Sequence, residues 1–147
     1  EQTMDLTKRA PRSGRVRLGG YVILPRMLDK GRAQLAGKNG DYHYACPMDQ
    51  NFLDFVGINP AQLKKQLAAG KGDSEILEWI QTHAKHKRTA SEAHAWSAYM
   101  EQRPPGDHES REYFNGVHSK IAPKREDILT WFDLLDLDDY VSYGGKP

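Results

Sequence analysis

Apolar residues recur at helical spacing along most of the chain, and one stripe stands out. Its apolar and small residues are Leu24, Met27, Leu28, Gly31 and Leu35. They share one face of a helix because an α-helix repeats every 3.6 residues. Pro25 suits the first turn of that helix, and Gly37 suits the left-handed residue that closes it. The pattern predicts a helix between these two residues, with the rest of the chain packed around it.

Similar stripes, each with a signal for a helix end, follow along the chain. The expected starts are Asp49, Asn59-Pro60, Asp73, the Thr89-x-x-Glu92 capping box, and Asp107 or Glu109, and the last helix is expected at 126–136. Ser, Thr, Asp and Asn start helices because their side chains accept hydrogen bonds from the free N–H groups of the first turn. The connections are short. These patterns predict a mainly α fold, a single compact domain of about six or seven helices.

Two short segments alternate between apolar and polar residues, as strands do. One covers residues 16–18, and the other covers residues 42–46, where Pro47 ends it. A period of two is typical of a strand that is buried on one face. The sequence therefore leaves room for a short two-stranded ribbon beside the first helix.

Residues 1–18 are expected to form a basic N-terminal arm, and residues 19–147 the helical domain. The arm is rich in Lys and Arg, has few apolar residues and is broken by Pro11 and Gly14. Two interpretations are open: an arm that binds nucleic-acid phosphates, or a solvated arm on its own domain or on a partner subunit. No aromatic residue stands among the charges to stack on a base, which favours the second. With little apolar surface to bury, residues 1–13 should be removable with almost no change in melting temperature.

Composition limits the class of protein. A chain of 147 residues, 38% hydrophobic and 28% charged, suits one soluble globular domain that buries roughly 70% of the surface of its unfolded chain. The net charge of +1 argues against binding to bulk nucleic acid or to a membrane surface. No apolar run approaches the ~18 residues of a membrane span. Cys46 is the single cysteine, which fits a reducing compartment, so we expect a cytoplasmic protein with neither a membrane nor a nucleic acid as partner.

The first helix carries the strongest candidate site. Arg26 and Lys30 lie one turn apart on it, with Asp29 beside them. Two cations at this spacing can hold a carboxylate or a phosphate, so one interpretation is a site for a small anionic ligand. The other is a structural ion-pair network with the acidic final helix, because buried charges need partners. Trp131 and Asp133 of that final helix complete the predicted ligand-binding set, since tryptophan gathers where a pocket or subunit interface begins.

Other chemistry has weaker support. The aspartates at 133–139 lack the ligand spacing of a calcium loop, and His43-x-x-Cys46 has no second pair to complete a zinc site. A lone cysteine after two tyrosines is interpreted as a small buried apolar residue rather than as a nucleophile. The phosphate-binding and dinucleotide-binding glycine patterns are missing. We therefore expect no metal and no cofactor.

Several segments, taken in order, resemble a bacterial family known as domain of unknown function fifty sixty-nine. They are Gly19-Gly20-Tyr21-Val22, Leu24-Pro25-Arg26-Met27, Asp29-Lys30, Phe52-Leu53, Gly57-Ile58, Glu75-Ile76-Leu77-Glu78-Trp79, Trp96-Ser97-Ala98-Tyr99, Asp127-Ile128 and Thr130-Trp131-Phe132-Asp133. The resemblance spans about residues 5–145 and departs at Gly31, where Ala or a larger apolar residue is expected. It implies a soluble bacterial protein and no particular mechanism, because the family has no assigned activity.

Two functions remain open on the sequence alone. The first is a non-enzymatic binding or interaction module, self-associating as a homodimer, in which the charged helix and an aromatic rim form a pocket or an interface. The second is a small enzyme that acts on an anionic metabolite. In that enzyme Arg26 and Lys30 would hold the anion, and Asp29 or Asp133 would be the general base. The missing catalytic signature favours the first.

Overall fold

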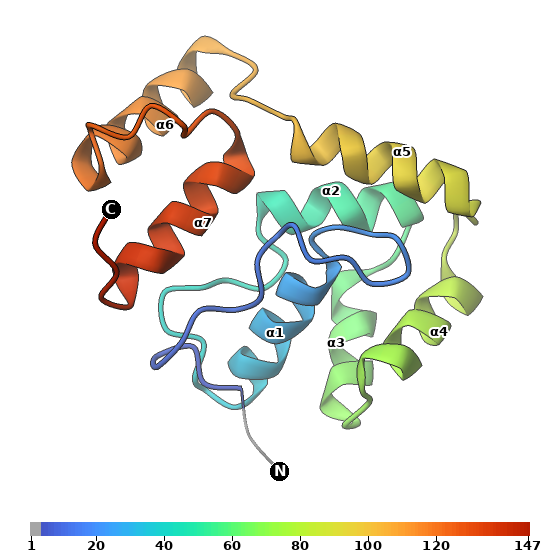
Figure 1. The fold of residues 1–147 in the computed structure, drawn as a ribbon. Coiled ribbons are helices and arrows are strands. Elements are labelled where there is room, and N and C mark those ends of the chain that lie inside the picture. The colour runs from blue at the N-terminus through green and yellow to red at the C-terminus, as the bar shows by residue number, and fades with distance from the viewer. Residues whose placement is uncertain (1–3) are drawn as a thin grey trace.

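The computed structural model describes residues 4–147, and the regular elements of this part of the chain are helices (Figure 1). Within these residues seven helices follow one another: α1 Leu24–Leu35, α2 Pro47–Val56, α3 Pro60–Ala68, α4 Asp73–His83, α5 Ala90–Glu101, α6 His108–Ile121 and α7 Trp131–Ser142. The prediction of a compact, mainly α fold is confirmed.

The predicted ribbon between residues 16–18 and 42–46 does not form. Leu18 instead makes an isolated bridge with Tyr21, three residues later. Gly19 and Gly20 allow this tight turn because both have positive φ, 59° and 86°. Residues 42–46 form part of the connection between α1 and α2, and no strand is formed within residues 4–147.

Helix α1 lies at the centre of the molecule. Every residue from Leu24 to Gly31 is buried, including the charged ones. Pro25 stands in the first turn, and Gly37 has the left-handed conformation with φ 69°, as the sequence predicts. A helix buried on nearly all sides must find partners for its charges inside the protein, because an unpaired buried charge is costly.

Gly31 allows α3 to come close to α1. A Cβ atom at this position would lie 2.6 Å from Leu67 Cδ1 and 3.0 Å from Tyr44 Cδ1. Both distances are shorter than normal contacts, so these two side chains occupy the space that alanine would need. The residue at which the chain departs from the family pattern is therefore a packing feature.

Three of the predicted helix ends differ from the structure. Helix α2 begins at Pro47, so Asp49 lies inside its first turn and is not the cap. Gly72, not Asp73, precedes α4. The last helix begins about five residues later than predicted, because Thr130 and Asp133 form a capping box that fixes its start. The caps at Asn59, Thr89 and Asp107 are confirmed.

The apolar core has two parts. The larger cluster is built from residues of the first five helices, α1 through α5, and includes Phe132 from the start of α7. A smaller cluster lies between α6 and α7, built from Phe114, Ala122, Ile128, Leu134 and Leu137. Figure 1 shows α6 and α7 next to each other, on one side of the body that α1 to α5 form.

The described part of the arm, residues 4–18, packs on the helices. Leu6 is 1% exposed, and its N–H donates to the carbonyl oxygen of Lys38 at 2.8 Å. Gly14 is buried against the ring of Phe132. Arginines of the arm form ion pairs with carboxylates of the helices: Arg12 with Asp29 and Asp73, Arg15 with Asp133 and Asp136, and Arg17 with Glu101. The arm therefore packs on its own domain, and the effect of removing residues 1–13 on the melting temperature stays a prediction.

Within residues 4–147, no helix combines the length and the apolar character that crossing a membrane requires.

Candidate functional site

A cavity of about 720 Å³ opens between α1, the connection from α1 to α2, and α7. Residues in the first turn of α2 and Tyr113 of α6 also line it. The cavity therefore lies where the α6–α7 pair meets the main helical body. Apolar side chains such as Leu6, Met48 and Leu135 share its lining with more charged and polar groups than most ligand pockets have.

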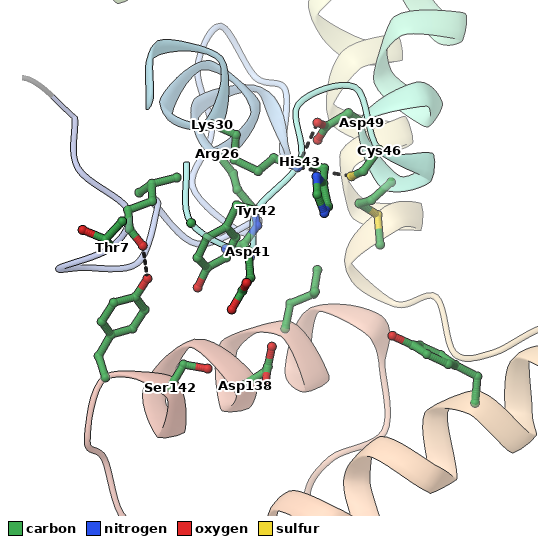
Figure 2. Close-up of a pocket in the computed structure, with 16 residues that line it drawn as sticks. Thr7, Arg26, Lys30, Asp41, Tyr42, His43, Cys46, Asp49, Asp138 and Ser142 are labelled. Carbon is green, nitrogen blue, oxygen red and sulfur yellow. Dashed lines mark hydrogen bonds and ion pairs between the residues drawn. The ribbon is translucent and has the colours of Figure 1, made fainter. Parts of the chain in front are cut away.

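Lys30, Cys46 and Asp49 form a compact group at the inner wall, which we call the cavity cluster. Lys30 Nζ lies 2.9 Å from Asp49 Oδ2 and donates a hydrogen bond to Cys46 Sγ at 3.2 Å. Figure 2 shows both contacts as dashed lines. Lys30 is 4% exposed and Asp49 is fully buried, whereas the Cys46 side chain is half-buried. An ammonium, a thiol and a carboxylate thus meet in a space that excludes most water.

The carboxylate of Asp49 is not fully paired. Neither of its oxygens has a hydrogen bond of normal geometry, although the ammonium of Lys30 is close. Burial raises the pKa of Asp49 above its ordinary value of 3.8, against the opposing effects of Lys30 and of nearby backbone N–H groups. Buried polar groups are nearly always hydrogen-bonded, so an incompletely paired carboxylate on a cavity wall is a feature of interest.

The backbone that holds this cluster is strained. Ala45 has φ 59°, a left-handed conformation that side chains other than glycine, asparagine and aspartate rarely adopt. It is followed by Cys46, the residue that precedes α2, and by Pro47 in the first turn. The strained turn directs the chain from the cavity edge into α2, and strained residues gather at functional sites.

A second buried pair borders the cavity. Arg26 Nη1 and Nη2 donate to the two oxygens of Asp139 at 2.7 and 3.2 Å, so the helix α1 is joined to α7. The hydroxyl of Tyr42 donates to Asp139 Oδ1 at 2.8 Å. Burial raises the pKa of Tyr42, and the carboxylate of Asp139 raises it further. The tyrosine therefore stays a neutral donor at physiological pH.

Two carboxylates on the cavity have no cation of their own. Among residues 4–147, neither Asp41 nor Asp138 forms an ion pair. Asp41 belongs to the connection after α1, and Asp138 to α7; both line the cavity. Partial burial raises the pKa of Asp138, and the charges of Asp139 and Asp41 raise it further. Surplus negative charge therefore gathers at the cavity edge.

The structure separates the residues that the sequence predicts as one site. Arg26 and Lys30 both line the cavity. Asp29, their neighbour on α1, does not: it accepts hydrogen bonds from the backbone N–H, Nε and Nη2 of Arg12 at 2.9 to 3.1 Å. Arg12 also pairs with Asp73, which pairs in turn with Arg32. We call Arg12, Asp29, Arg32 and Asp73 the arm network.

Trp131 and Asp133 also lie away from the cavity. Trp131 packs edge-on against Phe114, with ring centroids 5.4 Å apart, and lies 6.3 Å from Tyr113. It therefore packs near a residue that lines the cavity, Tyr113, without lining the cavity itself. Asp133 forms the capping box of α7 with Thr130 and pairs with Arg15. Its partner is thus an arm residue and not Lys30.

Sequence reasoning did not find four of the charged or polar residues that line the cavity with Lys30. They are Asp41, Tyr42, Asp49 and Asp138. A signal for Asp49 was present: Pro47 favours the first helical position, which puts Asp49 in the third and turns it toward the interior. The others come from a loop and a distant helix, and no sequence pattern brings them together.

Metal-binding geometry is not found in the part of the chain that the structure describes, where no three His, Cys, Asp or Glu side chains are grouped as ligands. The expectation that the protein needs no metal stays a prediction.

The fold and the cavity define a small all-α protein with a polar pocket beside its central helix. Residues 8–141 match the family model described as domain of unknown function (DUF5069), and the chain belongs to that family. No curated protein matches the chain.

Proposed function

We propose that the protein is a non-enzymatic binding module that holds a small polar molecule in the cavity beside α1. The cavity is large enough for a metabolite, at about 720 Å³. Its walls combine charged groups of the cavity cluster with the hydroxyl groups of tyrosines. The α6–α7 pair contributes one wall, so a bound molecule would tie the two parts of the core together.

The charges on the cavity favour an organic cation, such as a primary amine, as the ligand. The two cations that line it are already paired, Lys30 with Asp49 and Arg26 with Asp139. Asp41 and Asp138 are unpaired within the described residues, and this surplus is the observation that carries the proposal. An ammonium group between them would neutralise the surplus, and the ring of Tyr113 at the edge can add cation–π attraction.

The alternatives from the sequence gain less support. An anion at Arg26 and Lys30 would have to compete with carboxylates already at 2.7 and 2.9 Å. For an enzyme that acts on an anionic metabolite, the proposed general bases were Asp29 and Asp133, and neither lines the cavity. A bacterial origin, a cytoplasmic location and self-association as a homodimer stay predictions.

Melting curves with simple probes test the proposal. We expect 1,4-diaminobutane at millimolar concentration to raise the melting temperature of the full chain, and citrate or phosphate to raise it less. Binding to the folded state alone stabilises a protein, by about 2.7 kcal/mol when the ligand is at a hundred times its dissociation constant. Asp138→Asn should remove most of the rise because it removes half of the unpaired charge.

Asp54→Asn is the matched control, since Asp54 is an exposed aspartate on α2 that does not line the cavity. This variant should keep the full response to diamine. A larger rise with citrate than with diamine would overturn the preference for a cation and favour the anion site. An equal rise in wild type and Asp138→Asn would locate the bound amine outside the cavity.

A further inference from the structure

The cavity cluster holds a thiol and an amine close enough to form a bond once the sulfur has been oxidised. Lys30 Nζ lies 3.2 Å from Cys46 Sγ, and both groups line the cavity. A neighbouring lysine is one of the surroundings in which cysteine thiols become reactive. The half-buried sulfur faces a cavity that admits molecules much larger than hydrogen peroxide.

Asp49 is the independent observation that makes this more than an isolated cysteine. It is fully buried and lines the same cavity, its Oδ2 lies 2.9 Å from the amine, and neither oxygen has a hydrogen bond of normal geometry. A carboxylate in this state can accept a proton. Burial favours its protonated form, and its pKa is raised accordingly.

We propose that Cys46 and Lys30 form a reversible covalent sulfur–nitrogen link when the protein meets peroxide. The site is thus an oxidation sensor built into the wall of the cavity, and it does not depend on which ligand the cavity binds.

The link forms in two balanced steps. In the first, Cys46 Sγ attacks one oxygen of hydrogen peroxide and the O–O bond breaks. The sulfur is oxidised to a sulfenic acid, and the second oxygen leaves as water with the thiol proton. The peroxide is the oxidant and is reduced in this step.

In the second step, Lys30 passes one proton to Asp49, and the free amine attacks the sulfenic sulfur. The S–N bond forms, the S–O bond breaks, and the departing hydroxide takes a second proton from the nitrogen to become water. Sulfenic acids are known to condense with a nitrogen in this way, most often with a backbone amide. The product leaves Asp49 neutral, which suits a buried carboxyl without a cation. An added dithiol reverses the link and restores the thiol and the amine.

Mass spectrometry of the full chain after limited peroxide treatment tests the proposal. We expect wild type to lose about 2 Da, the two hydrogens removed in forming the link, and to regain them with dithiothreitol. A tryptic digest should show the peptides of Cys46 and Lys30 joined, with cleavage after Lys30 blocked. Cys46→Ser should show no loss.

Lys30→Arg keeps the positive charge but removes the nucleophilic amine. In this variant no link can form, so peroxide should oxidise the sulfur of Cys46 further, to sulfinic and sulfonic acid. Lys64→Arg is the matched control, because Lys64 is close to Tyr44 but has no contact with the thiol. That variant should form the link as wild type does. Loss of the same mass in Lys30→Arg would assign the link to a backbone nitrogen and overturn the proposal. So would a direct gain of about 32 Da in wild type, which marks sulfinic acid. The wild-type digest gives an independent answer if Lys30→Arg does not fold.

Discussion

Helix α1 contributes to two groups of charged residues, and the buried carboxylates of these groups, Asp29 and Asp49, differ in how completely they are paired. In the arm network, both oxygens of Asp29 accept hydrogen bonds from Arg12, one of them from the backbone N–H as well. In the cavity cluster, Asp49 has an ammonium nearby but no hydrogen bond of normal geometry. The first group joins the arm to the helices beside a smaller hollow of about 330 Å³, and the second lines the cavity of about 720 Å³.

This difference in hydrogen bonding gives a criterion that distinguishes a structural network from a candidate site. Charged residues that are neighbours on the same helix can belong to a structural network or to a candidate site, so the presence of charge does not distinguish a network from a site. Complete hydrogen bonding indicates that a group's purpose is structural, because nothing is left for a ligand. Incomplete pairing beside a cavity and a strained backbone indicates a site. Helix α1 thus has one side on which Asp29 is completely hydrogen-bonded and another side on which Lys30 faces the cavity.

The largest expected effect is the loss of the buried pair. Lys30→Met leaves the charge of Asp49 without a partner, and removing one member of a buried pair costs about 3–5 kcal/mol. We expect a loss of this size in the free energy of unfolding, measured with urea. The double variant Lys30→Met/Asp49→Leu should recover most of it, because no charge then remains buried.

Lys65→Met is the control for that comparison, since Lys65 is an exposed lysine on α3. Its free energy of unfolding should stay within about 0.5 kcal/mol of wild type. A double variant as unstable as Lys30→Met would show that the pair itself does not account for the loss.

The arm network should show a smaller effect on stability and none on binding. Asp29→Asn removes the carboxylate charge that accepts hydrogen bonds from Arg12. Hydrogen bonds to charged groups contribute about 1.5–3 kcal/mol to stability. The free energy of unfolding should fall by about that amount. The rise in melting temperature with diamine should match that of wild type. Loss of the diamine response in this variant would join the two groups into one site and contradict the comparison.

Acid should act on the two groups in opposite directions. Hydrogen bonds from Arg12 hold the pKa of Asp73 below its ordinary 3.8. As the pH falls, Asp73 is therefore protonated in the unfolded chain before it is protonated in the folded protein. The stability that Asp73 contributes is lost as the pH falls below 3.8. Burial raises the pKa of Asp49. The folded protein binds that proton first, so stability from this group is present in acid and lost as the pH rises through the raised pKa.

Unfolding curves between about pH 2 and about pH 7 measure this difference. Relative to wild type, Asp73→Asn should lose less stability on acidification, and Asp49→Asn should lose more. The same direction of change in both variants would contradict the assignment of opposite pKa shifts.

Much of the fold could be predicted because helix periods and caps are local. The stripe that begins at Leu24 and the caps at Asn59 and Thr89 depend on residues a few positions apart. The structure has both caps and buries the stripe from Leu24 to Gly31, whereas Leu35 at its end is 43% exposed. The start of α7 was missed because its cap, Thr130, stands inside the stripe that suggested an earlier helix. The packing of the arm was missed because it depends on Leu6 and on ion pairs with distant helices.

The candidate site was predicted only in part for the same reason. Arg26 and Lys30 were found because a helix face is visible in the sequence. Their partners Asp139 and Asp49 stand 113 and 19 positions away along the chain, and pairing over such separations is decided by tertiary packing. Asp29 was grouped with Arg26 and Lys30 because it is adjacent in sequence, although it turns to the arm.

The central claim is that the cavity beside α1 binds a cation between Asp41 and Asp138. A crystal structure of the full chain grown with 1,4-diaminobutane tests it most directly. The account predicts electron density for an ammonium group within hydrogen-bonding distance of both carboxylates, with the pair of Lys30 and Asp49 intact. Density for the diamine at another surface, with the cavity filled by water alone, would contradict it.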